Sequence, residues 1–320
     1  MKILVIQTAF IGDAILATAL LESLHHWNSK ASIDFMVRSG NESLFEEHPY
    51  INHLYIWHKP KNKIANLVKL AFDIRKQKYD LVVNLHRFAS SGFVSFMSGA
   101  KDKRGFDKNP LAFFYNKKVI HDLRVGLHET ERNHLLIADI VEAKSSKPKL
   151  YPSPKIFDSI KHLQTENYVC LAPASVWFTK QMPQVKWEQL AKKLSASTLV
   201  YLLGAPGDLK LCNAIAANVV HKNVIVLAGK LSLLQSAALM NSATMNYVND
   251  SAPMHLCSAM NAPVTVFFCS TIPQFGFGPL SDNSKIVEAT TPLDCRPCGI
   301  HGFRACPQQH FKCGNDIEIL

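Results

Sequence analysis

The sequence predicts an α/β protein made of two doubly wound domains, and three observations carry that prediction. Short runs rich in Ile, Leu and Val alternate with amphipathic stretches, which is typical of parallel strands joined by helices. The alternation is interrupted by a polar, proline-containing stretch at residues 144–154 and starts afresh beyond it. A chain of 320 residues is also long enough for two domains that each bury a core.

The first half should open with a buried strand at residues 2–8 and a helix at 14–27. Gly12 lies in the turn between them, where a missing side chain lets a ligand approach the backbone closely. Asp13 falls in the first helical turn, so its carboxylate is either stabilised by the helix dipole or placed to act as a general base. Further strands are expected at 32–37, 53–57 and 79–85, and further helices at 42–47, 62–78 and 129–143.

The second half repeats the pattern, so we place the first domain at residues 1–150 and the second at 151–320. Its most informative stretch is Asn-Asp-Ser-Ala-Pro-Met-His at 249–255, between a short strand and a helix that ends near Met260. Ser251 suits the N-cap of that helix, and Pro253 suits its first turn. The unpaired N–H groups at such a helix start attract phosphate, although an ordinary capped helix is an equal alternative. Other strands are expected at 168–172, 198–203, 224–227 and 263–268, and other helices at 183–194 and 233–240.

Several polar residues follow the predicted strands of the second domain and should gather at the carboxyl edge of its sheet. They are Ser175, Lys180, Asp208, Asp250, Ser251 and His255. A lysine together with a helix start can hold a diphosphate, and an acid after the second strand suits a ribose. The patterns G-x-G-x-x-G and G-x-x-x-x-G-K-[ST] are absent, which counts against a dehydrogenase and a P-loop NTPase.

The net charge of +10 lies mostly in the first half, where 22 Lys and Arg face 15 Asp and Glu. This excess indicates a phosphorylated ligand or an anionic membrane surface, or is merely a solvated basic face. A nucleic acid is not expected, because no nucleic-acid-binding motif accompanies the charge. The apolar segments 88–100 and 111–115 are candidates for lipid contact or for the core. No signal peptide or membrane span is recognisable, so we expect a cytoplasmic protein.

Four of the eight cysteines cluster near the end of the chain, at Cys295, Cys298, Cys306 and Cys313. Four thiols in one loop-rich segment suit a tetrahedral structural zinc, although the spacing is not that of two C-x2-C knuckles. Reduced and packed thiols are the alternative. The remaining cysteines lie in or beside apolar runs and should be buried.

In their order along the chain, these motifs resemble the ADP-heptose:lipopolysaccharide heptosyltransferases of glycosyltransferase family nine, most closely the heptosyltransferase II type. The resemblance covers essentially the whole chain. It rests on Ile-Gly-Asp-Ala-Ile-Leu at 11–16, on 173–187 with Trp177 and Lys180, on 249–255, and on 271–280. It implies a GT-B architecture, with two Rossmann-like doubly wound domains facing across a cleft. The first domain would bind the acceptor and the second the nucleotide sugar.

The resemblance also implies roles for single residues. Asp13 would be the general base that takes the acceptor proton, and Lys180 would neutralise the departing diphosphate with help from the helix start at Ser251 and Ala252. The rest of the donor-binding set would be Gly12, Ser175, Asp208 at the ribose, Leu231 at the adenine, and Asp250 with His255 at the heptose or phosphates. Three positions depart from the family pattern: Ala252 stands where relatives often have Gly, Val176 replaces a hydroxyl residue found in some members, and Asp208 is shorter than the matching glutamate.

The function that the resemblance implies is inverting transfer of heptose from ADP-heptose to the inner core of a lipopolysaccharide precursor. The reaction would need no metal and would take place at the inner face of the cytoplasmic membrane, with peripheral contact to its anionic surface. Two alternatives stay open: a related glycosyltransferase with another nucleotide sugar or acceptor, and a non-catalytic nucleotide-sugar-binding or lipid-binding protein of the same fold.

Overall fold

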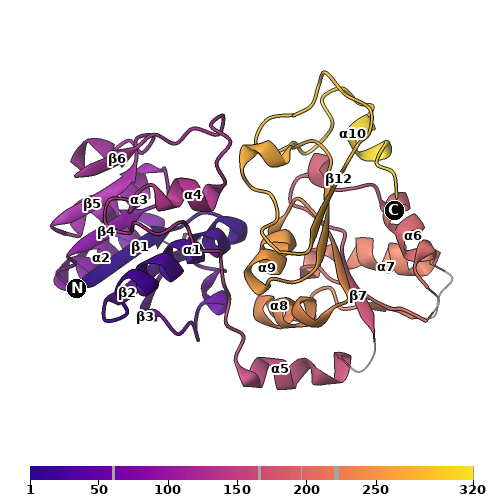
Figure 1. Cartoon of the computed structure of the whole chain (residues 1–320), viewed down its shortest axis with the longest axis horizontal. Helices are drawn as coiled ribbons and strands as arrows, with labels where there is room; N and C mark the ends of the chain where they lie inside the picture. Colours follow the sequence, from indigo (N-terminus) through magenta and orange to yellow (C-terminus); the bar gives the residue numbers. More distant parts are fainter. Residues whose placement is uncertain (60–61, 165–166, 196, 220–222, 320) are drawn as a thin grey trace. The chain divides into compact units, whose positions relative to one another are not determined.

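The computed structural model describes residues 1–59, 62–164, 167–195, 197–219 and 223–319 (Figure 1). The chain divides into two compact units, Met1–Tyr151 and Pro152–Leu320, where we expected a division after residue 150. Each unit is an α/β fold around one six-stranded sheet. In the described part of the chain, no helix is both long and apolar enough to span a bilayer.

The sheet of the first unit is parallel throughout, with the strand order β3-β2-β1-β4-β5-β6. Central strand β1 is flanked on both sides, and its residues from Ile3 to Ile6 are fully buried, which explains their continuous apolar sequence. Because the chain winds outward from β1 first in one direction and then in the other, β1 and β4 mark a topological switch point. The strands are β1 (Lys2–Gln7), β2 (Ser32–Arg38), β3 (Ile51–Trp57), β4 (Leu81–Asn84), β5 (Asp102–Phe106) and β6 (Lys117–Val119).

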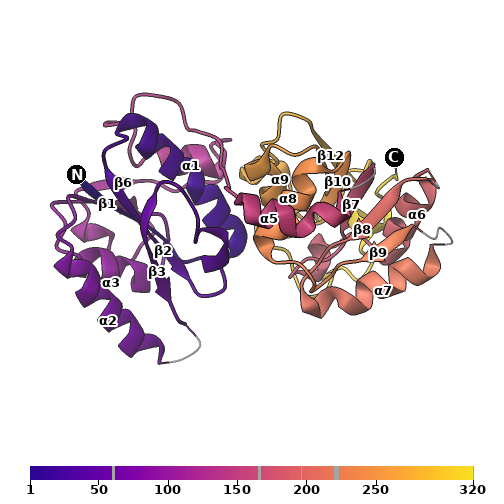
Figure 2. The same cartoon turned by 90° about the horizontal axis from the view of Figure 1, so that it is seen from below.

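Helices cover both faces of this sheet (Figure 2). α1 (Ile11–Trp27) and α4 (Glu129–His134) pack together on one face, and α2 (Lys63–Lys76) and α3 (Ala89–Met97) pack together on the other. The second pair buries an apolar stripe, including Ala71 of α2, against β1 and its neighbours. Short 3-10 helices, η1 (Glu42–Leu44) and η2 (Ala112–Phe114), lie in the connections.

Two predicted helices are shorter than expected. The helix predicted at 129–143 ends at His134 and continues as tight turns. A longer helix would use the Leu136 carbonyl to accept from residue 140, but Arg104 Nη1 donates to that carbonyl at 3.1 Å, and Ile140 N–H donates to Ile137 O instead. The helix predicted at 42–47 is only the 3-10 turn η1.

The second unit has an equivalent winding, with the order β12-β11-β10-β7-β8-β9 and parallel pairing throughout. Its switch point therefore lies between β7 and β10. The strands are β7 (Tyr168–Ala172), β8 (Leu199–Leu202), β9 (Val224–Val226), β10 (Met245–Asn249), β11 (Val264–Phe268) and β12 (Ser284–Glu288).

Trp187 is the largest fully buried side chain of the second unit. It lies on α6 (Gln184–Lys193) and packs edge-on against Phe267, with the two ring centroids 5.4 Å apart. Its indole N–H donates to Met182 O at 3.1 Å. The same core includes α7 (Leu209–Asn218) and the cysteine-rich tail, which ends in α10 (Lys312–Asn315). The opposite face carries α5 (Pro154–Ile160), α8 (Leu233–Ser242) and α9 (Ala252–Met260).

The end of the first unit is fastened to α1. The backbone N–H of Lys149 donates to Thr18 Oγ1 at 2.9 Å, and the Tyr151 hydroxyl donates to the Glu22 carboxylate at 2.9 Å. The polar stretch that sequence analysis treated as a linker is therefore ordered by hydrogen bonds up to Tyr151.

Candidate active site

A buried ion pair lies at the switch point of the second unit. Lys180 ends the 3-10 helix η4 (Phe178–Lys180) after β7, and Asp250 follows β10 directly. Lys180 Nζ lies 2.7 Å from Asp250 Oδ2, and the Thr271 hydroxyl, which follows β11, donates to the same oxygen at 2.5 Å. Both charged side chains are mostly shielded from solvent, so the attraction between them is screened little. Three neighbouring strands thus end at one polar cluster.

Asn249 holds the loop that carries Lys180. Its side-chain oxygen accepts from the Met182 N–H at 3.0 Å, and its side-chain amide donates to Pro173 O at 2.8 Å. Both ends of the loop after β7 are therefore tied to the last residue of β10. Because Asn249 is completely buried, these bonds are shielded from competing water.

The helix expected after Asp250 is α9, and Pro253 lies in its first turn as predicted. Ser251 does occupy the N-cap position, but its hydroxyl makes no capping bond and donates to Asn249 O at 3.4 Å. The predicted N-cap position of Ser251 is therefore confirmed, although its side chain makes no hydrogen bond to the first turn of the helix. Ala252 is the first residue of α9, and His255 is buried in its second turn.

The loops that carry Asp208 and Leu231 touch each other at the same edge, after β8 and β9. Gly229 N–H donates to Gly204 O at 2.9 Å, and Gly229 has φ +74°. A Cβ at Gly229 would lie 3.0 Å from the Pro206 backbone, so this approach requires glycine. Asp208 Oδ2 accepts the Ala205 N–H at 2.8 Å and shapes the loop.

The predicted donor residues of the second unit thus fall into two groups at one sheet edge. Lys180, Asp250 and the start of α9 form the group at β7 and β10. Asp208 and Leu231 belong to the group at β8 and β9. Ser175 lies in the loop that carries Lys180, where its backbone N–H donates to Gln181 Oε1 at 3.2 Å.

Asp13 lies at the switch point of the first unit. α1 begins at Ile11, three residues earlier than predicted, so Gly12 and Asp13 both belong to its first turn. Burial raises the pKa of Asp13 from 3.8 to about 6, and the nearby Glu129 carboxylate adds to the rise. The Arg87 guanidinium and backbone N–H groups act in the opposite direction. A carboxylate with this pKa is ionised at neutral pH yet basic enough to accept a proton in a reaction.

Sequence reasoning missed Arg87, Glu129 and Thr271 as parts of these sites. Arg87 follows β4 and Thr271 follows β11, so each ends a strand beside a switch-point strand. Position after a predicted strand was the available signal for both. Glu129 gave no such signal, because it begins a helix that only the packing of α4 on α1 brings near Asp13.

The four clustered cysteines are close enough to influence one another. Burial raises the pKa of the Cys298 thiol, and nearby Cys295 and Cys306 add to the rise. Burial also raises the pKa of Cys313 to about 11. Within the described residues, however, no group of three or more His, Cys, Asp or Glu side chains is placed to hold a metal ion. Cys313 is buried and the other three thiols are partly buried; the zinc site stays a prediction.

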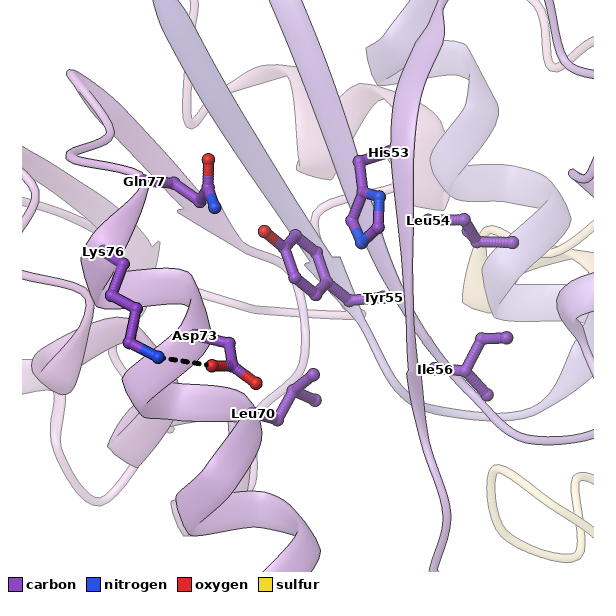
Figure 3. A pocket seen from close by; sticks show the side chains of 8 residues that line it. All are labelled: His53, Leu54, Tyr55, Ile56, Leu70, Asp73, Lys76 and Gln77. Carbon is purple, nitrogen blue, oxygen red and sulfur yellow. Dashed lines mark hydrogen bonds and ion pairs between the residues drawn. The ribbon is translucent and has the colours of Figure 1, made fainter.

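A groove of about 390 Å³ lies elsewhere in the first unit, between edge strand β3 and α2 (Figure 3). Figure 3 shows the His53 and Tyr55 rings at one side of the groove and the Asp73–Lys76 ion pair at the other. None of the predicted site residues lines it.

Comparisons with known proteins agree with this architecture. Residues 67–300 match the family model described as glycosyltransferase family 9 (heptosyltransferase). The chain is 28% identical to lipopolysaccharide heptosyltransferase 3 of Escherichia coli, over 82% of each chain. It is 25% identical to lipopolysaccharide heptosyltransferase 1 of Campylobacter coli, over 90% of this chain and 89% of the relative.

A solved structure of E. coli ADP-heptose lps heptosyltransferase II superposes with a TM-score of 0.80 at 22% identity, over 98% of each chain. The predicted GT-B-type α/β fold, with one doubly wound sheet in each unit, is thereby confirmed. These relatives are of three different types, so the match does not single out one of them. The chain belongs to glycosyltransferase family 9, the heptosyltransferase family, and is a glycosyltransferase.

Proposed function

We propose that this glycosyltransferase transfers heptose from ADP-heptose to the inner core of a lipopolysaccharide precursor, with inversion at the anomeric carbon. The observation that carries the chemistry is Asp13, a carboxylate whose pKa is raised to about 6 at the switch point of the first sheet. An inverting displacement needs one base for the incoming hydroxyl and one stabilised leaving group. The mechanism requires Asp13 to reach the acceptor hydroxyl while the second unit holds the donor.

The donor site that we propose is the carboxyl edge of the second sheet. Lys180 and the N–H groups at the start of α9 would take the charge that develops on the departing ADP. Asp250 fixes the position of the Lys180 ammonium group through their 2.7 Å contact. Asp208 would bind the ribose and Leu231 would line the adenine pocket, and their two loops are in contact. This arrangement supports a nucleoside diphosphate sugar as the donor.

The reaction that we propose needs no metal cofactor, because a lysine and backbone amides supply the positive charge. Adding a chelator should leave the initial rate unchanged. A rate that falls with the chelator and returns with Mg²⁺ or Mn²⁺ would contradict this part of the proposal.

The test of the whole function is an acceptor and donor panel. Purified protein should release ADP from ADP-heptose only when a truncated inner-core acceptor is present, and not from UDP or GDP sugars. Anomeric coupling constants of the product would report inversion. Asp13→Ala should bind ADP like the wild type but lose turnover. A protein that binds ADP-heptose without turnover on any inner-core acceptor would instead be a binding module.

We also propose that the first unit docks on an anionic membrane surface at the inner face of the cytoplasmic membrane, through an aromatic cluster on α3 and η2. Phe96, Phe113 and Phe114 are 41%, 67% and 39% exposed. Their rings nevertheless pack together: the ring centroid of Phe114 lies 4.2 Å from that of Phe96 and 4.1 Å from that of Phe113. Contiguous exposed aromatic rings are uncommon on a soluble surface and suit the interfacial layer of a bilayer. Exposed Lys108 and Lys118 lie close by in the sequence, and Lys118 shares a surface hollow with Phe113.

Vesicle flotation tests this docking surface. The wild type should float with vesicles that contain phosphatidylglycerol and bind much less to phosphatidylcholine vesicles, because the lysines supply the electrostatic attraction. Phe113→Ser combined with Phe114→Ser should reduce binding several-fold. Phe72→Ser is the matched control, since Phe72 is 50% exposed on α2 outside the cluster. Equal loss in the control, or binding indifferent to lipid charge, would contradict the proposal.

A further inference from the structure

A network of charged and polar side chains, buried except for the partly exposed Arg87, runs from the carboxyl end of β4 to α4 in the first unit. Arg87 Nη1 lies 3.0 Å from His121 Nδ1, and His121 Nε2 lies 3.1 Å from Glu129 Oε2. Arg132 Nε donates to the same Glu129 oxygen at 2.8 Å. His121, Glu129 and Arg132 are 0%, 5% and 1% exposed. Burying such groups is costly, and apolar residues often stabilise a fold as well or better.

Hydrogen bonds and packing fix the orientation of the His121 ring. A guanidinium group has only donors, so His121 Nδ1 must accept from Arg87, and the ring proton must sit on Nε2 and be donated to Glu129. Asp107 Oδ1 accepts the His121 backbone N–H at 3.0 Å, and the Phe106 ring packs edge-on against the imidazole. The imidazole is therefore an oriented bridge between a cation and a carboxylate.

Two members of this network, Arg87 and Glu129, belong to elements that neighbour those carrying Asp13. β4 pairs with β1, so Arg87 and Asp13 follow adjacent strands, and α4 packs on α1 with Glu129 as its first residue. The charged groups that act on Asp13 from these elements are Glu129, which raises its pKa, and Arg87, which lowers it. His86, next to Arg87, is hydrogen-bonded to Thr8, and burial lowers its pKa to about 3, so it stays neutral.

We propose that Arg87, His121, Glu129 and Arg132 are positioning residues for Asp13: a relay that holds the Arg87 guanidinium near the base. The inference rests on the proposed role of Asp13 as the general base. With Asp13 ionised, two carboxylates and two guanidinium groups balance each other. Burial would raise the pKa of Glu129, but its bonds to His121 and Arg132 outweigh burial and keep it ionised. The relay thus supplies a cation and an anion on which the basicity of Asp13 depends.

The test is the pH dependence of kcat/KM in variants that remove one charge at a time. Arg87→Met removes a group that favours ionised Asp13, so the acid limb of the profile should move up by about one pH unit. Glu129→Gln removes a group that disfavours it, so the limb should move down by a similar amount. The donor KM should change little while kcat falls, and Arg87→Lys should restore part of the shift. Arg124→Gln is the control, because Arg124 is exposed and pairs with Asp122.

A merely structural role predicts a different outcome. If folded Arg87→Met and Glu129→Gln proteins keep the wild-type limb while Asp13→Ala is inactive, the relay does not act on the base, and this inference fails alone. If Asp13→Ala retains full turnover, the proposed base fails and the inference falls with it. Should Glu129→Gln not fold, Arg87→Met still decides, because Arg87 is partly exposed and its removal leaves the Glu129–Arg132 pair in place.

Discussion

Replacing Asp13 with asparagine should stabilise the protein but lower its turnover by about a hundredfold or more. The pKa of Asp13 is about 6 in the folded chain against an ordinary value of 3.8. A difference of about two units corresponds to about 3 kcal/mol that the folded state loses by keeping this carboxylate ionised. The asparagine side chain carries no charge and avoids that cost, so about 3 kcal/mol is the upper limit of the gain at pH 8. For a domain of this size the midpoint of thermal unfolding should rise by at most about 6–12 °C.

The sign of the pH dependence follows from the raised pKa. The folded state binds the Asp13 proton more tightly than the unfolded state, so the wild type gains relative stability as the pH falls from about 6 towards 4. The difference in the free energy of unfolding between Asp13→Asn and the wild type should therefore be largest at pH 8, smaller at pH 5 and close to zero at pH 4. Differential scanning calorimetry at these three values measures it.

Wild-type activity should fall as the pH falls, whereas the relative stability of the wild type rises. Only ionised Asp13 can accept a proton, so wild-type kcat/KM should fall tenfold per pH unit below about pH 6. Loss of a general base typically lowers the rate by about a hundredfold to ten-thousandfold. A variant less stable than the wild type at pH 8, or one that retains wild-type turnover, would refute the reasoning.

Three further outcomes are expected in the second unit and its tail. Lys180→Met should weaken ADP binding by about tenfold or more in calorimetric titration, because the diphosphate loses its ammonium partner; unchanged affinity would place the diphosphate elsewhere. Asn249→Ala should lower the free energy of unfolding by about 2–3 kcal/mol, since Met182 N–H and Pro173 O both lose a buried partner; a chemical denaturation curve that overlays the wild type would disprove this. If the clustered cysteines hold a structural zinc, metal analysis of protein purified without added zinc should find one equivalent that Cys298→Ser loses; metal-free protein would contradict the zinc prediction.

Much of the fold was predictable because its central strands are buried on both faces. β1 and β7 are continuous apolar runs, and the sequence marks them without ambiguity. β5 and β6 were not predicted, because the charged residues Asp102-Lys103-Arg104 and Lys117-Lys118 interrupt the apolar pattern that marks a strand. Their charged side chains find ion-pair partners: Arg104, for example, pairs with Asp102 on the same strand and with Asp139, 35 residues away. A partner as distant in the sequence as Asp139 leaves no local pattern.

The candidate site was predictable only as a set of residues at one sheet edge. Lys180 and Asp250 were both expected there, but their ion pair depends on β10 lying next to β7. Strand order is fixed by pairing between segments about 75 residues apart, which hydrophobic periodicity does not encode. The same limit explains why Arg87 was missed, since only the adjacency of β4 and β1 brings it to Asp13.

The hydrogen bonds that fasten Lys149 and Tyr151 to α1 also shorten the free connection between the two units. The first unit ends at Tyr151, and α5 of the second begins at Pro154, so only Pro152 and Ser153 lie between them. Proline fixes φ at both Pro152 and Pro154. The connection between Tyr151 and α5 therefore contains only a few freely rotating backbone torsion angles.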